Sequence, residues 1–217
     1  MTNLSAQQEA YFKDSKIRDK EGNLIPCYHG TPNGDFTYFD NTRKFDGKNA
    51  FSWFSNDKGL SSTYSDDEDE EDYFDAFEEK PSKAKVFDVY LNITAPIYVG
   101  ELDRECFEIK NGKLYMTDEL VQVAANCNIE PKSFAKFAYD YYKNNLSGEV
   151  PGLEDLQLFD VVKNPEFRQL LLKHNPNCDG IICVDNDGKS TTYGIMEPNQ
   201  AKLISNLNPT TNKDFDK

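Results

Sequence analysis

The order of two hydrophobic periodicities constrains the fold of this 217-residue chain more than any other feature. Residues 84–93 alternate between two faces, one of them apolar, which is the period-two pattern of a strand. Between residues 134 and 141, apolar side chains recur at spacings of three and four, the pattern of an amphipathic helix. Strand-like runs occupy both ends of the chain and helical patterns occupy its middle. This order predicts an α+β fold with helices packed around and inserted into antiparallel strands.

Capping and turn residues complete the expected set of elements. Strands are expected at 24–28, 51–55, 84–93, 180–184, 191–196 and 200–205. Helices are expected at 5–13, 57–64, 117–125, 134–141, 153–163 and 164–172. Asp187-Gly188 is expected to form a hairpin turn. We predict a single domain over residues 1–205, with a mainly helical insertion at 101–175 and a polar, frayed tail at 206–217.

The negative charge of the chain is concentrated in one segment. Lys and Arg total 24 and Asp and Glu total 38, so the net charge is −14, and ten of the acids lie between Asp66 and Glu79. A non-specific nucleic-acid binder needs a basic face and is therefore disfavoured. We interpret residues 66–83 as a solvated, flexible insertion. An acidic element that docks a basic partner is the alternative.

The cysteines and the N-terminus indicate a reducing compartment. The five cysteines are an odd number without a CxxC pair, and with two histidines they assemble no structural zinc set, so no metal site is expected. The N-terminal residues lack an apolar signal core, and no apolar run approaches 18 residues. We expect a cytoplasmic protein, of the producing cell or of a host, with buried cysteines. A thiol enzyme built on Cys27 beside His29 is disfavoured by the geometry of a strand.

Three residues are candidates for a ligand site on their own chemistry. His29 is expected at the end of a strand, followed by Gly30, which permits close backbone approach. Trp53 and Tyr64 are expected at a strand and at the end of the next helix, where they could flank a flat ring. The alternatives are an ordinary, partly buried histidine and two core aromatic residues.

Taken together and in order, four segments resemble the ADP-ribosyltransferase superfamily. They are Tyr28-His29-Gly30-Thr31, Phe51 to Tyr64, Asp179 to Ile182, and Thr192 to Lys202. The branch they resemble is the diphtheria-toxin and poly(ADP-ribose) polymerase type, with its His, Tyr, Glu signature. Residues 13–19 and the Pro-Asn-Gln step at 198–200 are similar to domains of large phage polyvalent proteins. The resemblance implies split antiparallel β-sheets that form an NAD cleft.

The resemblance also implies roles for individual residues. His29 would bind the adenosine-side ribose hydroxyls of NAD, and the Gly30 backbone would bind the nicotinamide carboxamide. Trp53, in place of the family's signature Tyr, and Tyr64 would hold the nicotinamide by stacking, while Ser62 would bind the carboxamide. The residues implied to bind NAD are His29, Gly30, Thr31, Trp53, Phe54, Ser62 and Tyr64.

The third signature residue departs from the family. Counting back from Gln200 places the family's catalytic Glu at Thr192, which carries no charge to stabilise the oxocarbenium ion. Three interpretations stay open. Another group can supply the function, the candidates being Glu197, Asp185, Asp187 and Gln200. The acceptor can lend a carboxylate, or the protein can bind NAD or ADP-ribose without turnover. The catalytic candidates are thus His29, Tyr64, Thr192 and Glu197.

The resemblance therefore implies a mono-ADP-ribosyltransferase. It would cleave NAD, release nicotinamide and transfer ADP-ribose to a macromolecular acceptor, as an effector of a phage or bacterium. Residues 185–191 contain only Lys189 as a base, so a protein acceptor is favoured over nucleic acid, and no membrane is expected to take part. The alternatives are a catalytically silent NAD-binding module and an acidic interaction protein.

Overall fold

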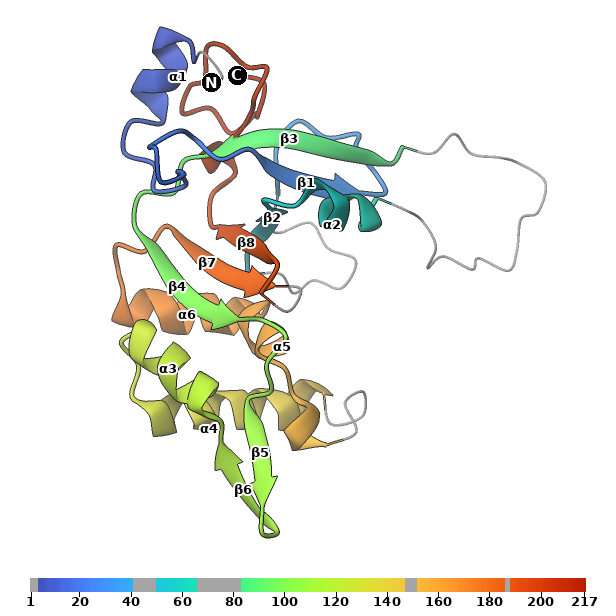
Figure 1. Cartoon of the computed structure of the whole chain (residues 1–217), viewed down its shortest axis with the longest axis vertical. Coiled ribbons are helices and arrows are strands. Elements are labelled where there is room, and N and C mark those ends of the chain that lie inside the picture. Colours follow the sequence, from blue (N-terminus) through green and yellow to red (C-terminus); the bar gives the residue numbers. More distant parts are fainter. Residues whose placement is uncertain (1–3, 41–49, 66–82, 147–151, 186–187) are drawn as a thin grey trace, which may run out of the picture. The chain divides into compact units, whose positions relative to one another are not determined.

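The computed structural model describes residues 4–40, 50–65, 83–146, 152–185 and 188–217 (Figure 1). The chain divides into two compact units: Met1–Asp40, Trp53–Ile93 and Glu197–Lys217 form the first, and Asn41–Ser52 and Thr94–Met196 the second. Strands and helices occur in both units, so the predicted α+β class is confirmed. The predictions for the acidic run 66–79 and for Asp187 lie outside the described residues.

The first unit is built on antiparallel strands in the order β2-β1-β3-β9. These are β1 (Cys27–Thr31), β2 (Ser52–Ser55), β3 (Lys85–Leu91) and β9 (Ala201–Leu203). Its helices are α1 (Ala6–Tyr11), α2 (Lys58–Thr63) and the 3-10 turn η3 (Pro198–Gln200). Helix α2 lies against β1 (Figure 1). This unit contains every residue expected to bind NAD.

Strand β1 begins and ends later than the sequence suggested. Residues before Cys27 pair with the N-terminal segment instead, through a bridge between Arg18 and Leu24. Pro26 has no N–H to donate to a ladder, which favours a strand start at the next residue. The ladder with β3 then continues to Thr31. His29 is therefore the central residue of the strand, opposite Phe87, and not its last residue.

The second unit carries strands in the order β4-β7-β8, with β4 parallel and β8 antiparallel to β7. These strands are β4 (Pro96–Glu101), β7 (Gly180–Asp185) and β8 (Ser190–Ile195). Its helices are α3 (Asp118–Asn126), α4 (Pro131–Tyr141), α5 (Leu158–Val162) and α6 (Pro165–His174). A π-turn (Tyr142–Leu146) and a 3-10 turn (Leu153–Asp155) complete it. Thr117 and Asn164 cap α3 and α6, and both helices begin within one residue of the predicted start.

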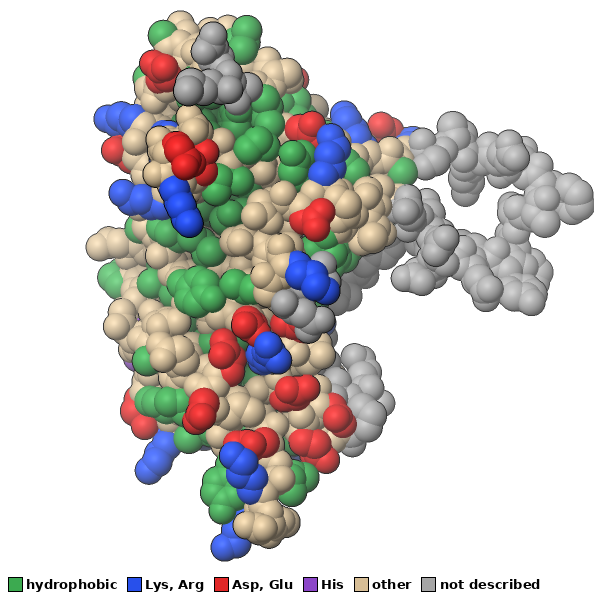
Figure 2. Space-filling model, viewed as in Figure 1, with side chains coloured by type: hydrophobic (Ala, Val, Ile, Leu, Met, Phe, Trp, Pro, Cys, Tyr) green, Lys and Arg blue, Asp and Glu red, His purple; other side chains and the backbone are tan. Residues whose placement is uncertain are grey.

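Residues 101–175 contain a β-hairpin as well as the expected helices. Strands β5 (Phe107–Lys110) and β6 (Lys113–Met116) are joined by Asn111 and Gly112, whose φ angles are 53° and 69°. Two positive φ angles at an Asn-Gly pair are typical of the turn that suits a tight hairpin. The hairpin exposes apolar side chains at the lower edge of Figure 2, namely Ile109, Leu114 and Tyr115.

The C-terminal segment is packed, so the expectation of a frayed tail is wrong. Residues 206–217 form no strand or helix, but Phe215 is only 5% exposed. The Phe215 N–H donates to the carbonyl of Thr37, and its carbonyl accepts from the N–H of Leu203. An aromatic side chain and two backbone bonds hold this polar segment on the first unit.

Candidate functional site

His29 is fixed by a hydrogen bond to the neighbouring strand. Its Nδ1 lies 2.7 Å from the carbonyl oxygen of Trp53 on β2. A carbonyl oxygen only accepts, so Nδ1 carries a proton and donates it. Burial lowers the pKa of His29 from its ordinary value of 6.5, against the smaller opposing effect of this hydrogen bond. The ring is therefore neutral at neutral pH, and its Nε2 is a hydrogen-bond acceptor.

Aromatic rings pack against the imidazole, which remains partly exposed. The ring centroids of Phe39, Phe54 and Phe36 lie 5.0, 5.3 and 6.4 Å from that of His29. Phe54 is only 2% exposed and Phe39 only 3%. Both therefore support the histidine from inside the core. Phe54, expected among the residues that bind NAD, is placed to orient His29 rather than to meet a ligand.

Gly30 is required by the close approach of α2. A Cβ at this position would lie 1.7 Å from the carbonyl oxygen of Ser61, far inside contact distance. The hydroxyl of Ser61 also donates to the carbonyl of Tyr28 at 3.1 Å, so helix and strand are joined on both sides of His29. Successive strand residues face opposite sides of a sheet, so α2 covers the face opposite to the imidazole.

The two aromatic residues expected to hold a flat ring lie on this helix-covered face. Tyr28 pairs with Ser55, which places Ser55 and, by alternation, Trp53 on the side of α2. Tyr64 is the C-cap of α2 and is 62% exposed. The β1–β2 ladder consists of that one pair, and beyond it the His29 side chain bonds the β2 backbone. The histidine thus occupies the place where the two strands part.

The two hydroxyl residues expected in the site are engaged locally. Ser62 is half-buried, and its Oγ donates to the carbonyl of Gly59 within α2 at 2.8 Å. Thr31 Oγ1 exchanges 3.3 Å hydrogen bonds with the backbone of Asn33. The serine that faces β1 is instead Ser61, three residues and thus about one helical turn before Tyr64. In the sequence, the three-residue spacing from Ser61 to Tyr64 is the signal for a serine one helical turn before that tyrosine.

Thr192 lies in the second unit, on β8, and is 7% exposed. It pairs with Cys183 of β7, and its hydroxyl donates to the Asp185 carboxylate at 3.2 Å. Thr192 itself carries no charge, but its side chain is hydrogen-bonded to a carboxylate on the neighbouring strand. Asp187, another candidate for this charge, lies outside the described residues.

Glu197 and Gln200 form a turn. The N–H of Glu197 donates to Gln200 Oε1 at 2.8 Å, at the start of η3. The turn leads into β9, whose first residue pairs with Leu91, whereas His29 pairs with Phe87. Four strand residues span about 13 Å, and β3 lies between β1 and β9. The structure does not bring Glu197 or Gln200 to His29.

Metal and thiol chemistry find no support in the described part of the chain. Among the described residues, no group of three or more His, Cys, Asp or Glu side chains is arranged to hold a metal ion. All five cysteines are free and buried, as expected. Cys27 shares a face of β1 with His29, but its burial raises the pKa of the thiol far above the usual range. A buried thiol of this kind is a poor nucleophile.

The α+β fold is consistent with the ADP-ribosyltransferase class, and a comparison with known families shows that class directly. The family model described as ADP-Ribosyltransferase in polyvalent proteins matches residues 19–211. The chain therefore belongs to this family, and the resemblance inferred from the sequence is confirmed. A search of curated proteins and a search of solved structures each found no match. In the part of the chain that the structure describes, no helix is long and apolar enough to cross a membrane.

Proposed function

We propose that this domain is a mono-ADP-ribosyltransferase that cleaves NAD, releases nicotinamide and transfers ADP-ribose to a macromolecular acceptor. The family carries ADP-ribosyltransferase activity, for which NAD is the general donor. The observation that carries the proposal is the 2.7 Å contact between His29 Nδ1 and the carbonyl oxygen of Trp53, which fixes the tautomer of the ring. Its Nδ1 proton is committed to Trp53, so Nε2 accepts a hydrogen bond from a ribose hydroxyl.

Groups on the face of the sheet opposite to the imidazole would take the rest of the dinucleotide. The Gly30 backbone takes the carboxamide, and Trp53 and Tyr64, which share the α2 face, hold the nicotinamide ring by stacking. Each good stacking contact contributes on the order of 1 kcal/mol. In the reaction, the bond from ribose C1′ to the nicotinamide nitrogen breaks and its electron pair leaves with nicotinamide. An acceptor nucleophile then bonds to C1′ and loses its proton.

The oxocarbenium ion formed at C1′ needs a nearby negative charge. The first candidate for this role is Asp185, whose carboxylate accepts a hydrogen bond from the hydroxyl of the uncharged Thr192. Glu197 is the second candidate and is disfavoured by its position in the η3 turn. A carboxylate of the acceptor is the third.

A protein acceptor is favoured over a nucleic acid. The chain carries a net charge of −14, which repels phosphate, and residues 185–191 contain Lys189 as their only base. We place the reaction in the cytoplasm of the producing cell or of a host.

The decisive experiment incubates the purified protein with labelled NAD and a cell lysate. Released nicotinamide and label on macromolecules are followed for the wild type, His29→Ala and His174→Ala. The last is a matched control, because His174 lies on α6 in the second unit. Transfer lost in His29→Ala and kept in His174→Ala supports the proposal, and equal activity in all three proteins overturns the assigned site.

The uncharged Thr192 specifically favours one rival, a module that binds NAD without turning it over. Saturable NAD binding that His29→Ala abolishes, without release of nicotinamide by the wild type, would establish that rival. Absence of both NAD binding and NAD turnover would mean that the chain shares the fold of the family and not its activity.

A further inference from the structure

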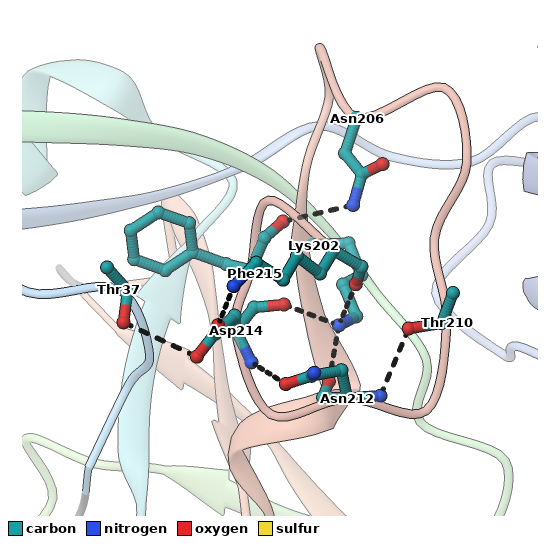
Figure 3. Close-up of polar contacts among 8 residues, drawn as sticks. Thr37, Lys202, Asn206, Thr210, Asn212, Asp214 and Phe215 are labelled. Atoms are coloured by element: carbon teal, nitrogen blue, oxygen red, sulfur yellow. Dashed lines mark hydrogen bonds and ion pairs between the residues drawn. The ribbon is translucent and has the colours of Figure 1, made fainter.

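A fully buried lysine holds the C-terminal segment of the first unit. Lys202, on β9, has 0% exposure. Its Nζ donates to the main-chain oxygens of Asn212, Asp214 and Lys217 at 2.5, 2.6 and 2.6 Å (Figure 3). An ammonium group has three protons, so each one has its own acceptor. The lysine thus binds three points of a segment that has no secondary structure of its own.

The segment is shaped so that its main-chain oxygens converge on Lys202. The N–H of Asn212 donates to Thr210 Oγ1 at 3.2 Å, and the N–H of Asp214 donates to Asn212 Oδ1 at 3.0 Å (Figure 3). Such side-chain to backbone bonds fold a chain into tight local turns. Burial lowers the pKa of Lys202 to about 8, while the charges of Asp214 and Asp216 act in the opposite direction. At neutral pH the group therefore remains mostly an ammonium ion.

The same segment lies along the loop that supplies the rings around His29. Besides the bond between the Phe215 N–H and the Thr37 carbonyl, Thr37 Oγ1 donates to Asp214 Oδ1 at 3.4 Å (Figure 3). The ammonium of Lys213 lies 3.9 Å from the ring centroid of Tyr38. The loop is thereby bonded to the C-terminal segment at two successive residues.

Phe215 completes the aromatic cluster behind the histidine. Its ring centroid lies 5.1 Å from Phe87, 5.3 Å from Phe39 and 6.0 Å from Phe36. Phe39 and Phe36 are two of the three phenylalanine rings against His29. Both come from a loop without helix or strand, so their positions depend on what packs behind them.

We propose that Phe215 is a positioning residue for His29, and that Lys202 holds it in place by binding the C-terminal segment. Phe215 fills the back of the cluster, keeps Phe39 and Phe36 against the imidazole, and so preserves the bond of Nδ1 to Trp53. Its effect on NAD rests on the function proposed above. Its effect on the histidine itself does not, and can be measured without NAD.

Nuclear magnetic resonance of the two histidine rings tests this directly. In Phe215→Ala we expect the pKa of His29 to rise towards its ordinary 6.5 and the ring to exchange between tautomers, because the imidazole gains access to water. Lys202→Met, which keeps the bulk of the side chain and removes the ammonium, should shift His29 in the same direction. His174, in the second unit, should not change and reports that the second unit is folded.

Two further variants make the result decisive. Phe215→Leu keeps most of the apolar volume and should give a smaller shift in the same direction. Leu207→Ala changes a side chain of the same segment that is 57% exposed, and should leave His29 unchanged. Should Phe215→Ala fail to fold, the comparison rests on Phe215→Leu and Lys202→Met. An unchanged pKa and tautomer of His29 in the folded variants overturns the proposal.

Kinetics separate this proposal from the proposed function. Phe215→Ala should raise the KM for NAD about tenfold with a smaller change in kcat, since a displaced binding group weakens positioning before it affects bond cleavage. A wild type that neither binds nor cleaves NAD defeats the proposed function, while the resonances of His29 still decide the role of Phe215. Normal NAD turnover with an unmoved His29 defeats only the positioning role.

Discussion

Two regions of the molecule carry the signature residues, and they differ in how completely they match the family pattern. Around His29, the first unit holds a neutral imidazole with one defined acceptor nitrogen, a glycine under a helix and two aromatic residues on one face. Around Thr192, where the resemblance places the family's glutamate, the second unit holds a hydroxyl that is hydrogen-bonded to Asp185. On the proposed function, the groups that would recognise NAD lie in the first unit, with Trp53 in place of the signature Tyr, and the uncharged Thr192 stands in place of the catalytic Glu. If the proposed function holds, we expect NAD binding and bond cleavage to be separable by mutation.

The largest effect is expected from Gly30→Ala, which would break the first region. A methyl group 1.7 Å from the Ser61 carbonyl oxygen must displace α2 from β1. We expect a loss of about 3 kcal/mol or more in the free energy of unfolding, as for other severe steric conflicts, together with loss of NAD binding. Thermal unfolding and calorimetry measure both. Gly59→Ala, within α2 itself, is the matched control and should keep both properties.

Asp185→Asn tests the second region. If Asp185 supplies the charge, its loss should lower kcat by about 10²–10³, which corresponds to about 2.7–4 kcal/mol, while the Kd for NAD stays unchanged. Glu197→Gln should have little effect, since Glu197 lies in the η3 turn. Single-turnover release of nicotinamide gives the comparison. A larger loss in Glu197→Gln than in Asp185→Asn would reverse the assignment.

The bond between Thr192 and Asp185 can be removed with little change in size by Thr192→Val. A hydrogen bond to a charged acceptor contributes about 1.5–3 kcal/mol, so kcat should fall by about tenfold or more if the carboxylate must be oriented. Thr192→Ser keeps the hydroxyl and should keep the rate. Equal activity of the two variants would show that Thr192 does not orient Asp185.

Ser61→Ala tests the same region of the first unit, with a smaller expected effect. The Ser61 hydroxyl joins α2 to the Tyr28 carbonyl, and its loss should cost about 1 kcal/mol of unfolding free energy and weaken NAD binding. Ser62→Ala removes a bond within the helix, so it should change both quantities less. Denaturant unfolding of the two variants decides which serine joins the helix to the strand.

Local signals in the sequence were sufficient for many elements. Asp57, one of two cap candidates with Asn56, and Asn164 cap their helices, because a cap needs only its own side chain and the next few N–H groups. Strand β4 was not foreseen, since it pairs in parallel with β7, more than 80 residues later. The β5–β6 hairpin was not predicted, although its Asn-Gly pair is a local turn signal.

In the candidate site, too, local features could be predicted from the sequence and long-range contacts could not. The resemblance identified His29 and Gly30, but the bond to the Trp53 carbonyl requires two strands to part at one pair, which no pattern in one strand predicts. Phe215 was assigned to a polar tail because its neighbours are Asn, Lys and Asp. Its burial depends on Lys202, whose three acceptors lie 10 to 15 residues further along the chain.

The smallest predicted effect concerns pH and the same histidine. Burial lowers the pKa of His29 in the folded protein below the 6.5 of the unfolded chain, so between these two values the unfolded state binds more protons. The contribution to stability is therefore complete above pH 6.5 and is lost as the pH falls through the lower, folded pKa. His29→Gln, whose amide can still donate to Trp53, lacks this titration. Relative to that variant, the wild type should lose at most about 1.4 kcal/mol per pH unit below pH 6.5. Parallel curves for the two proteins between pH 7 and pH 5 would mean that the histidine takes up its proton equally well in the folded and unfolded states. The aromatic cluster would then not protect the acceptor nitrogen that the proposed function assigns to NAD.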